Sequence, residues 1–102
     1  MLAKKIRKTK DGLGFIYELS SPITYKDISY DFVITKSYSS YAVVQGFFHM
    51  PSYSCLVGAI KTDEGFRQGE TIWKLQHNKF SHSSILAQLN IKVANKVEWQ
   101  KK

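Results

Sequence analysis

A short apolar stretch in the middle of the sequence constrains the fold more than any other feature. Residues 41–48 read Tyr-Ala-Val-Val-Gln-Gly-Phe-Phe, a run rich in β-branched and aromatic side chains. Such a run predicts a β-strand that is covered on both faces, because a strand with one wet face alternates apolar and polar residues. The rest of the chain is therefore expected to form layers over this strand.

The composition also favours a sheet within one domain. Six Tyr, six Phe and two Trp make 14% of the sequence, and these side chains prefer strands. The length of 102 residues fits a single domain, 1–102. No apolar run approaches the roughly 20 residues of a membrane-spanning helix, and the basic start lacks the apolar part of a signal peptide. We therefore expect no membrane partner. Cys55 is the single cysteine, which excludes an internal disulfide and predicts a reducing, cytoplasmic location.

Turn-forming residues divide the first part of the chain into strands. Asp11-Gly12 can supply the positive φ angles of a tight hairpin and predicts that residues 2–9 pair with residues 14–20. Pro22 lacks a backbone N–H donor, so the second strand is expected to end there. The first strand has few apolar anchors and several lysines, so we expect it at a sheet edge.

A second hairpin is expected around Lys26-Asp27, between residues 23–25 and a strand over residues 28–36. The alternative for its first half is one helical turn that begins at Pro22. The strand over residues 28–36 is expected to alternate between two faces, one with Tyr30, Phe32 and Ile34 and the other with Asp31, Val33 and Thr35.

The apolar stretch needs a partner strand. Residues 41–49 and 53–61 are expected to pair as a hairpin, which makes Phe47 and Leu56 core residues on opposite faces. Gly58 then lies in the interior of a strand, where glycine requires a reason. A bend in the sheet, a flat seat for a helix, or a ligand against the backbone would each supply one.

The last third of the chain predicts a loop, two strands and a helix. Residues 63–70 are expected to form a polar loop, followed by strands over 71–77 and 91–99. Between those strands a short helix is predicted over residues 81–89, capped by Ser81. Its apolar stripe, which must dock on the sheet, consists of Ile85, Leu86 and Leu89.

These elements together predict the fold class. We expect an α+β domain with a predominantly antiparallel sheet of five to seven strands and one short helix late in the chain. A small, partly open β-barrel is the alternative architecture.

The residues that carry chemistry are sparse. His49, His77 and His82 are the only histidines, and without clustered cysteines or carboxylates they predict no metal site. Cys55 lies within a predicted strand, which favours a buried, inert thiol. No phosphate-binding or dinucleotide motif is present. We therefore predict no catalytic residue and no cofactor.

The charge is concentrated at the two ends of the sequence. The net charge is +7; five of the first ten residues are Lys or Arg, and four lysines follow residue 91, whereas the middle is nearly neutral. If the first and last strands are neighbours, Lys4, Lys8, Lys92 and Lys96 form one basic stripe, and the sheet tyrosines beside it could stack with bases. The residues predicted to bind nucleic acid are Lys4, Lys5, Arg7, Lys8, Lys92 and Lys96.

One helix cannot cover two apolar faces of a central hairpin, so one face is expected to meet a second copy of the chain or another protein partner. The predicted interface consists of Val43, Gln45, Phe47, His49, Tyr53 and Val57. We therefore expect a small basic, non-enzymatic binding module that forms a homodimer. Nucleic-acid binding is the close alternative, and a small nuclease-type enzyme, with acids from Asp63, Glu64 and Glu70, is the remote one.

Overall fold

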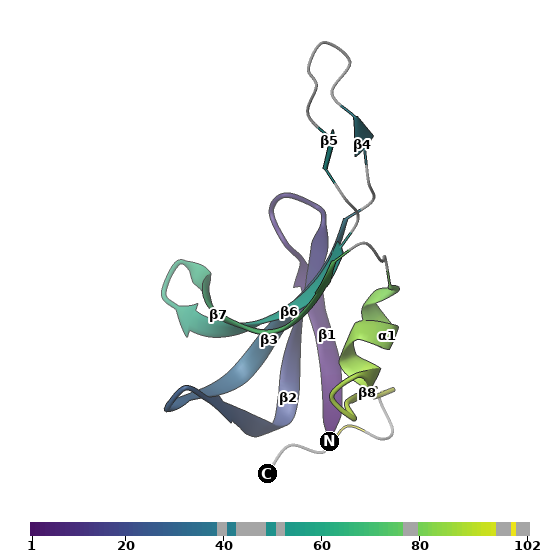
Figure 1. The fold of residues 1–102 in the computed structure, drawn as a ribbon. Coiled ribbons are helices and arrows are strands. Elements are labelled where there is room, and N and C mark those ends of the chain that lie inside the picture. The colour runs from purple at the N-terminus through teal and green to yellow at the C-terminus, as the bar shows by residue number, and fades with distance from the viewer. Residues whose placement is uncertain (39–40, 43–48, 51–52, 77–79, 96–98, 100–102) are drawn as a thin grey trace.

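The computed structural model describes residues 1–38, 41–42, 49–50, 53–76, 80–95 and 99. It has a six-stranded sheet in the order β7-β6-β3-β2-β1-β8, with one short helix, α1 (His82–Ala87) (Figure 1). Every pairing in this sheet is antiparallel except β1 with β8. The predicted α+β class is therefore confirmed. The strands are β1 (Leu2–Lys8), β2 (Gly14–Tyr25), β3 (Ile28–Tyr38), β6 (Tyr53–Thr62), β7 (Gly65–Gln76) and β8 (Lys92–Val93).

The hairpin predicted at Asp11-Gly12 joins β1 and β2. Gly12 has a positive φ of 74°, and the Leu13 N–H donates to the Asp11 carboxylate at 3.0 Å. The Thr9 hydroxyl also donates to this carboxylate. A short acidic side chain and a glycine thus fix the turn locally, which is why the sequence predicts it correctly.

Pro22 does not end the second strand, contrary to the prediction. Strand β2 continues to Tyr25, but its register against β3 is interrupted between Glu18 and Ile23. Pro22 lies inside that interruption, so its missing backbone N–H leaves no hydrogen bond of the ladder unmade. Lys26 and Asp27 then form the expected second turn with φ angles of 49° and 65°.

The predicted pairing of residues 41–49 with 53–61 is wrong. Strand β6 lies between β3 and β7, and both of these long strands pair with it along most of its length. Strand β4 (Tyr41–Ala42) pairs instead with β5 (His49–Met50), in a separate two-stranded sheet that projects from the body (Figure 1). Residues 43–48, the rest of the apolar stretch with Phe47, lie outside the described residues.

The predicted loop over residues 63–70 is mostly strand, because β7 begins at Gly65. Two aromatic residues anchor this polar segment. The Phe66 and Phe32 ring centroids are 5.0 Å apart, and the Glu70 N–H donates to the Tyr30 hydroxyl at 3.1 Å. The sequence predicts a loop here because the segment itself is polar, whereas the residues that anchor it, Phe32 and Tyr30, lie on another strand.

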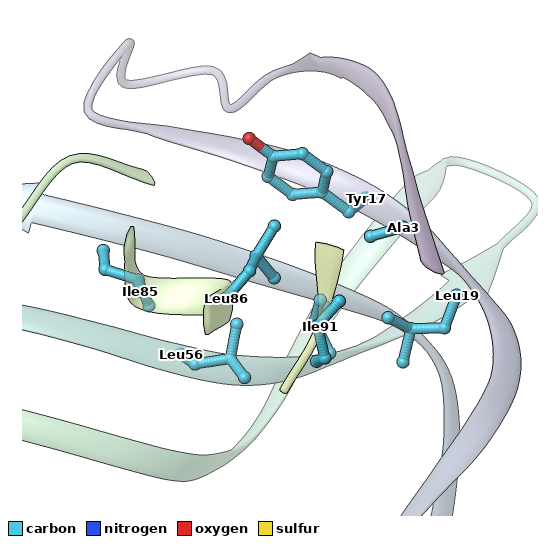
Figure 2. Packing of buried hydrophobic residues seen from close by; sticks show 8 residues of the cluster. Ala3, Tyr17, Leu19, Leu56, Ile85, Leu86 and Ile91 are labelled. Carbon is cyan, nitrogen blue, oxygen red and sulfur yellow. The ribbon is translucent and has the colours of Figure 1, made fainter. Parts of the chain in front are cut away.

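Helix α1 covers one face of the sheet. Ser81 caps it by accepting a hydrogen bond from the Ser84 N–H, and Asn90 follows its end with a φ of 60°. Figure 2 shows the fully buried Ile85 and Leu86 against Leu56 of β6, so the predicted stripe and core position are confirmed. Of the strand predicted over residues 91–99, the structure describes only Lys92–Val93 as strand.

None of the described residues forms a helix over the opposite face, yet the centre of that face is buried. The cluster there is Ile16, Ile34, Cys55, Val57 and Ala59, each no more than 6% exposed. The sheet is strongly curved (Figure 1), so the Arg7 guanidinium of β1 lies 5.8 Å from the Phe66 ring centroid of β7, across three intervening strands. This face is therefore concave, and the chain covers it by curling. No described helix is long and apolar enough to cross a membrane.

Candidate nucleic-acid interface

The basic residues predicted to bind nucleic acid gather on β1. Lys4, Lys5, Arg7 and Lys8 are all exposed on this strand. Strand β8 runs parallel to its first residues, so Lys92 pairs with Leu2 at the same edge. The first strand and Lys92, the described lysine of the C-terminal basic segment, are therefore neighbours, as the prediction requires. Lys96 lies outside the described residues.

A β-bulge at Ile6 changes which cations share a face. Lys5 pairs with Tyr17 and Arg7 with Ile16, so Ile6 has no partner in β2. Because paired residues share a face, Lys4 and Arg7 lie on the concave face, and Lys5 and Lys8 lie on the helix-covered face. The predicted stripe with Lys4 and Lys8 together is wrong, since the bulge shifts the alternation by one residue.

On the helix-covered face, two lysines surround one aromatic ring. The Lys5 and Lys8 ammonium nitrogens lie 4.2 Å and 6.0 Å from the Phe15 ring centroid. The His82 ring meets Phe15 edge-on at 4.6 Å between centroids, and its Nδ1 lies 2.8 Å from the Thr35 hydroxyl. Phe15 therefore positions cations and is no open stacking surface.

On the concave face, Arg7 borders a shallow cavity of about 320 Å³ with Lys10 and Lys36. Asp11 and Glu64 line the same cavity. The hydrogen bond from Thr9, and then the one from the Leu13 N–H, lower the pKa of Asp11, so this carboxylate stays charged. The cavity thus carries both signs of charge and does not select an anion.

The outer edge of β1 carries a third feature, a groove. The Ala94 N–H donates to the Ala3 carbonyl at 2.8 Å, which ends the described pairing of β8 with β1. Beyond that bond lies a groove of about 590 Å³, lined by Lys4, Lys5, Val93, Ala94, Asn95 and Trp99. Trp99 is absent from the predicted site. The signal that would have found it is an aromatic residue in the basic segment that follows residue 91.

The tyrosines considered for base stacking are less available than expected. Tyr17 and Tyr30 are 2% and 1% exposed. Tyr25 and Tyr53 are half-buried, and each lies beneath a lysine ammonium, Lys26 at 5.6 Å and Lys74 at 4.9 Å from the ring centroid. Tyr17 is the ring paired with a β1 cation, Lys5, but it is buried and offers no open surface for stacking.

The predicted dimer interface is not assembled on one described surface. Val57 is 1% exposed, because the chain's own concave core covers it. Tyr53 is half-buried and begins β6, whereas His49 belongs to β5 in the projecting sheet. Val43, Gln45 and Phe47 lie outside the described residues.

In the part of the chain that the structure describes, the groups suited to catalysis are dispersed. Among the described residues, no three His, Cys, Asp or Glu side chains cluster in a way that could hold a metal ion. Cys55 is buried as predicted, and burial raises the pKa of its thiol. Asp63 and Glu64 form the β6–β7 turn, while Glu70 lies within β7, so the three acids do not share a loop. No protein-family model, curated protein or solved structure matches the chain.

Proposed function

We propose that this protein is a non-enzymatic binding module that holds nucleic acid along β1. The observation that carries the proposal is the set of four exposed cations on both faces of this one strand, Lys4, Lys5, Arg7 and Lys8. Lys4 and Lys8 are four residues apart, about 13 Å along a strand at about 3.3 Å per residue. One strand of a duplex carries one phosphate per about 3.4 Å of helix axis, so a run of cations of this length can face more than one phosphate.

The placement of the cations favours a polymer over a small anion. A small anion would be held by convergent charges, but on β1 Lys4 and Arg7 lie on one face and Lys5 and Lys8 on the other. Cations that follow one another along a strand can contact successive phosphates of a flexible nucleic-acid backbone. The buried, lone Cys55 supports a reducing compartment, and we place this activity in the cytoplasm.

The test is oligonucleotide binding measured by fluorescence anisotropy at low salt. Lys4→Glu combined with Lys8→Glu reverses one cation on each face and should weaken binding at least about tenfold, as expected when several phosphate contacts are lost. The matched control is Lys26→Glu combined with Lys74→Glu, which changes the net charge equally at exposed positions off β1. Absence of wild-type binding at low salt, or an equal loss in the control, would contradict the proposal.

Self-association is a second candidate function, favoured by the projecting sheet. Within the described part of the chain, strands β4 and β5 pair only with each other, and the sequence between them, Val-Val-Gln-Gly-Phe-Phe, is largely apolar. A largely apolar sequence of this kind fits contact with a second copy. Light scattering at high micromolar concentration should then give a dimer, and Gln45→Lys a folded monomer. A monomeric wild type would remove this candidate.

A further inference from the structure

The groove beside β1 joins an aromatic wall to two cations. Its lining includes Trp99 and Val93 from the end of the chain and Lys4 and Lys5 of β1. Trp99 is half-buried and is held by its backbone, since its N–H donates to the Asn95 carbonyl at 3.2 Å. The volume of about 590 Å³ lies within the range of about 300–1,000 Å³ that is typical of small-ligand sites.

The backbone adds polar groups to this groove. The Ala3 carbonyl points outward from β1, because it accepts the hydrogen bond from the Ala94 N–H. Residues two apart in a strand direct their N–H and C=O groups to the same side, so the Lys5 backbone also points to this edge. The groove therefore offers an indole, two ammonium groups, an amide side chain on Asn95 and a strand edge.

We infer that the groove binds one unstacked base of a single-stranded nucleic acid, with the base against the Trp99 indole. This inference rests on the proposed function and specifies its ligand. A base has a flat apolar face and a hydrogen-bonding edge. The phosphates on either side of it in the strand supply the negative charge that Lys4 and Lys5 complement. In a duplex the base faces are already stacked, so single strands bind more tightly than duplexes.

The experiment reads Trp99 directly through its fluorescence. The sequence has two tryptophans, and Trp73 packs on Phe80 within the helix-covered face, at 5.9 Å between ring centroids. Trp73→Phe leaves Trp99 as the only reporter, and Trp99→Phe leaves Trp73. A deoxythymidine oligonucleotide of about 12 nucleotides, within the usual site sizes, should quench the first variant and leave the second unchanged.

Affinity is measured in the same titrations at low salt. Trp99→Ala should weaken binding by about 5- to 150-fold, the range expected for the loss of one stacked base. Poly-glutamate of matched charge tests the other polymer that could occupy a basic strand edge, an acidic peptide. It should bind through the cations without quenching Trp99.

The outcomes separate this inference from the proposed function. Oligonucleotide binding without Trp99 quenching, or unchanged affinity in Trp99→Ala, would overturn the inference and leave the proposed function standing. Equal quenching by poly-glutamate would overturn it in favour of an acidic peptide. Absence of any oligonucleotide binding by the wild type would overturn both. If Trp99→Ala does not fold, quenching in the Trp73→Phe variant still decides the matter.

Discussion

Tyr30 shows how one side chain fixes the path of three strands. A Cβ atom on Gly58 of β6 would lie 2.5 Å from its ring, and one on Gly69 of β7 would lie 2.7 Å away. The ring is 1% exposed and its hydroxyl accepts a hydrogen bond from Glu70. The ladder pairs Gly58 with Val33, so Tyr30 lies on the face of Val33, not on that of Phe32 as strict alternation predicts. Position 58 therefore requires glycine because the Tyr30 ring occupies the space that a Cβ atom would need.

Gly58→Ala should therefore destabilise the protein by about 1–3 kcal/mol, the usual cost of an overpacked core. Alanine gains about 0.5–1 kcal/mol over glycine in a strand, but the clash outweighs this gain because the buried ring has no room to move. Urea denaturation measures the difference. In a Tyr30→Val background the same substitution should be neutral or stabilising. A cost that persists there would show that the ring is not its cause.

The buried thiol of Cys55 predicts a pH dependence of stability. Burial is the largest cause that raises the pKa of Cys55 in the folded protein, above the value of the unfolded chain. The unfolded state then loses its thiol proton first, so the free energy of unfolding falls as pH rises from about 8 toward 10. Cys55→Ala should flatten this decline, measured by denaturation at several pH values. An identical slope in both proteins would contradict the expectation.

The bulge in β1 decides which cations the strand presents on each of its faces. A regular strand would leave Lys4 and Lys8 on one face and Arg7 on the other. Ile6 is 40% exposed and has no partner in β2, so it acts as an inserted residue that changes the alternation after Lys5. The bulge also distorts the edge, which discourages pairing with other chains.

Deletion of Ile6 should consequently leave the fold almost unchanged. Lys5 and Arg7 would become neighbours opposite Tyr17 and Ile16, the partners they already have. We expect a change in unfolding free energy within about 1 kcal/mol, typical of positions without packing or pairing roles.

The matched control is deletion of Lys4, which is paired with Glu18. That deletion moves the fully buried Ala3 by one register position and to the opposite face. Thermal denaturation should show a large loss for this variant only. Equal losses in the two variants would mean that Ile6 is not the bulged residue.

The curvature of the sheet explains how its second face is covered. The concave cluster is buried by strands of the same chain, with Arg7 over Phe66 where the edges approach. The molecule thereby leaves the β1 rim as the place where charge accumulates. The net charge of +7 derives from the two ends of the sequence, and the pairing of β1 with β8 places Lys92 beside the first strand.

Binding at this rim predicts a definite salt dependence. Four to five phosphate contacts on a single strand give a slope of about −3 for log K against log salt concentration, at about −0.7 per contact. Arg7→Ala should reduce the slope by about 0.7, because one contact is lost. Anisotropy titrations at four or more salt concentrations measure both values. A slope near zero would mean that the β1 cations do not contact phosphates.

The sequence predicts most of this fold because most of its signals are local. The Asp11-Gly12 turn, the Lys26-Asp27 turn and the Ser81 cap each act within a few residues, and each is observed. Strand partners are not local. The apolar pattern of β6 is compatible with any neighbouring strand, so the pattern cannot identify β3 as its partner. The bulge at Ile6 is likewise not marked by any residue type in the sequence. The cations were predicted, but the groove required knowledge of which segment lies beside β1.

The parallel pairing of β1 with β8 has a consequence for the order in which the protein forms. The Met1 and Ala3 carbonyls accept from Lys92 and Ala94, about ninety positions later, so synthesis of nearly all of this sequence precedes their pairing. Contacts this distant close slowly and late in folding. The Trp99 groove lies at this seam, so a strand bound across it would hold the two ends together. Amide hydrogen exchange at Lys92 and Ala94 would then slow on binding, and the ligand would act as a clasp.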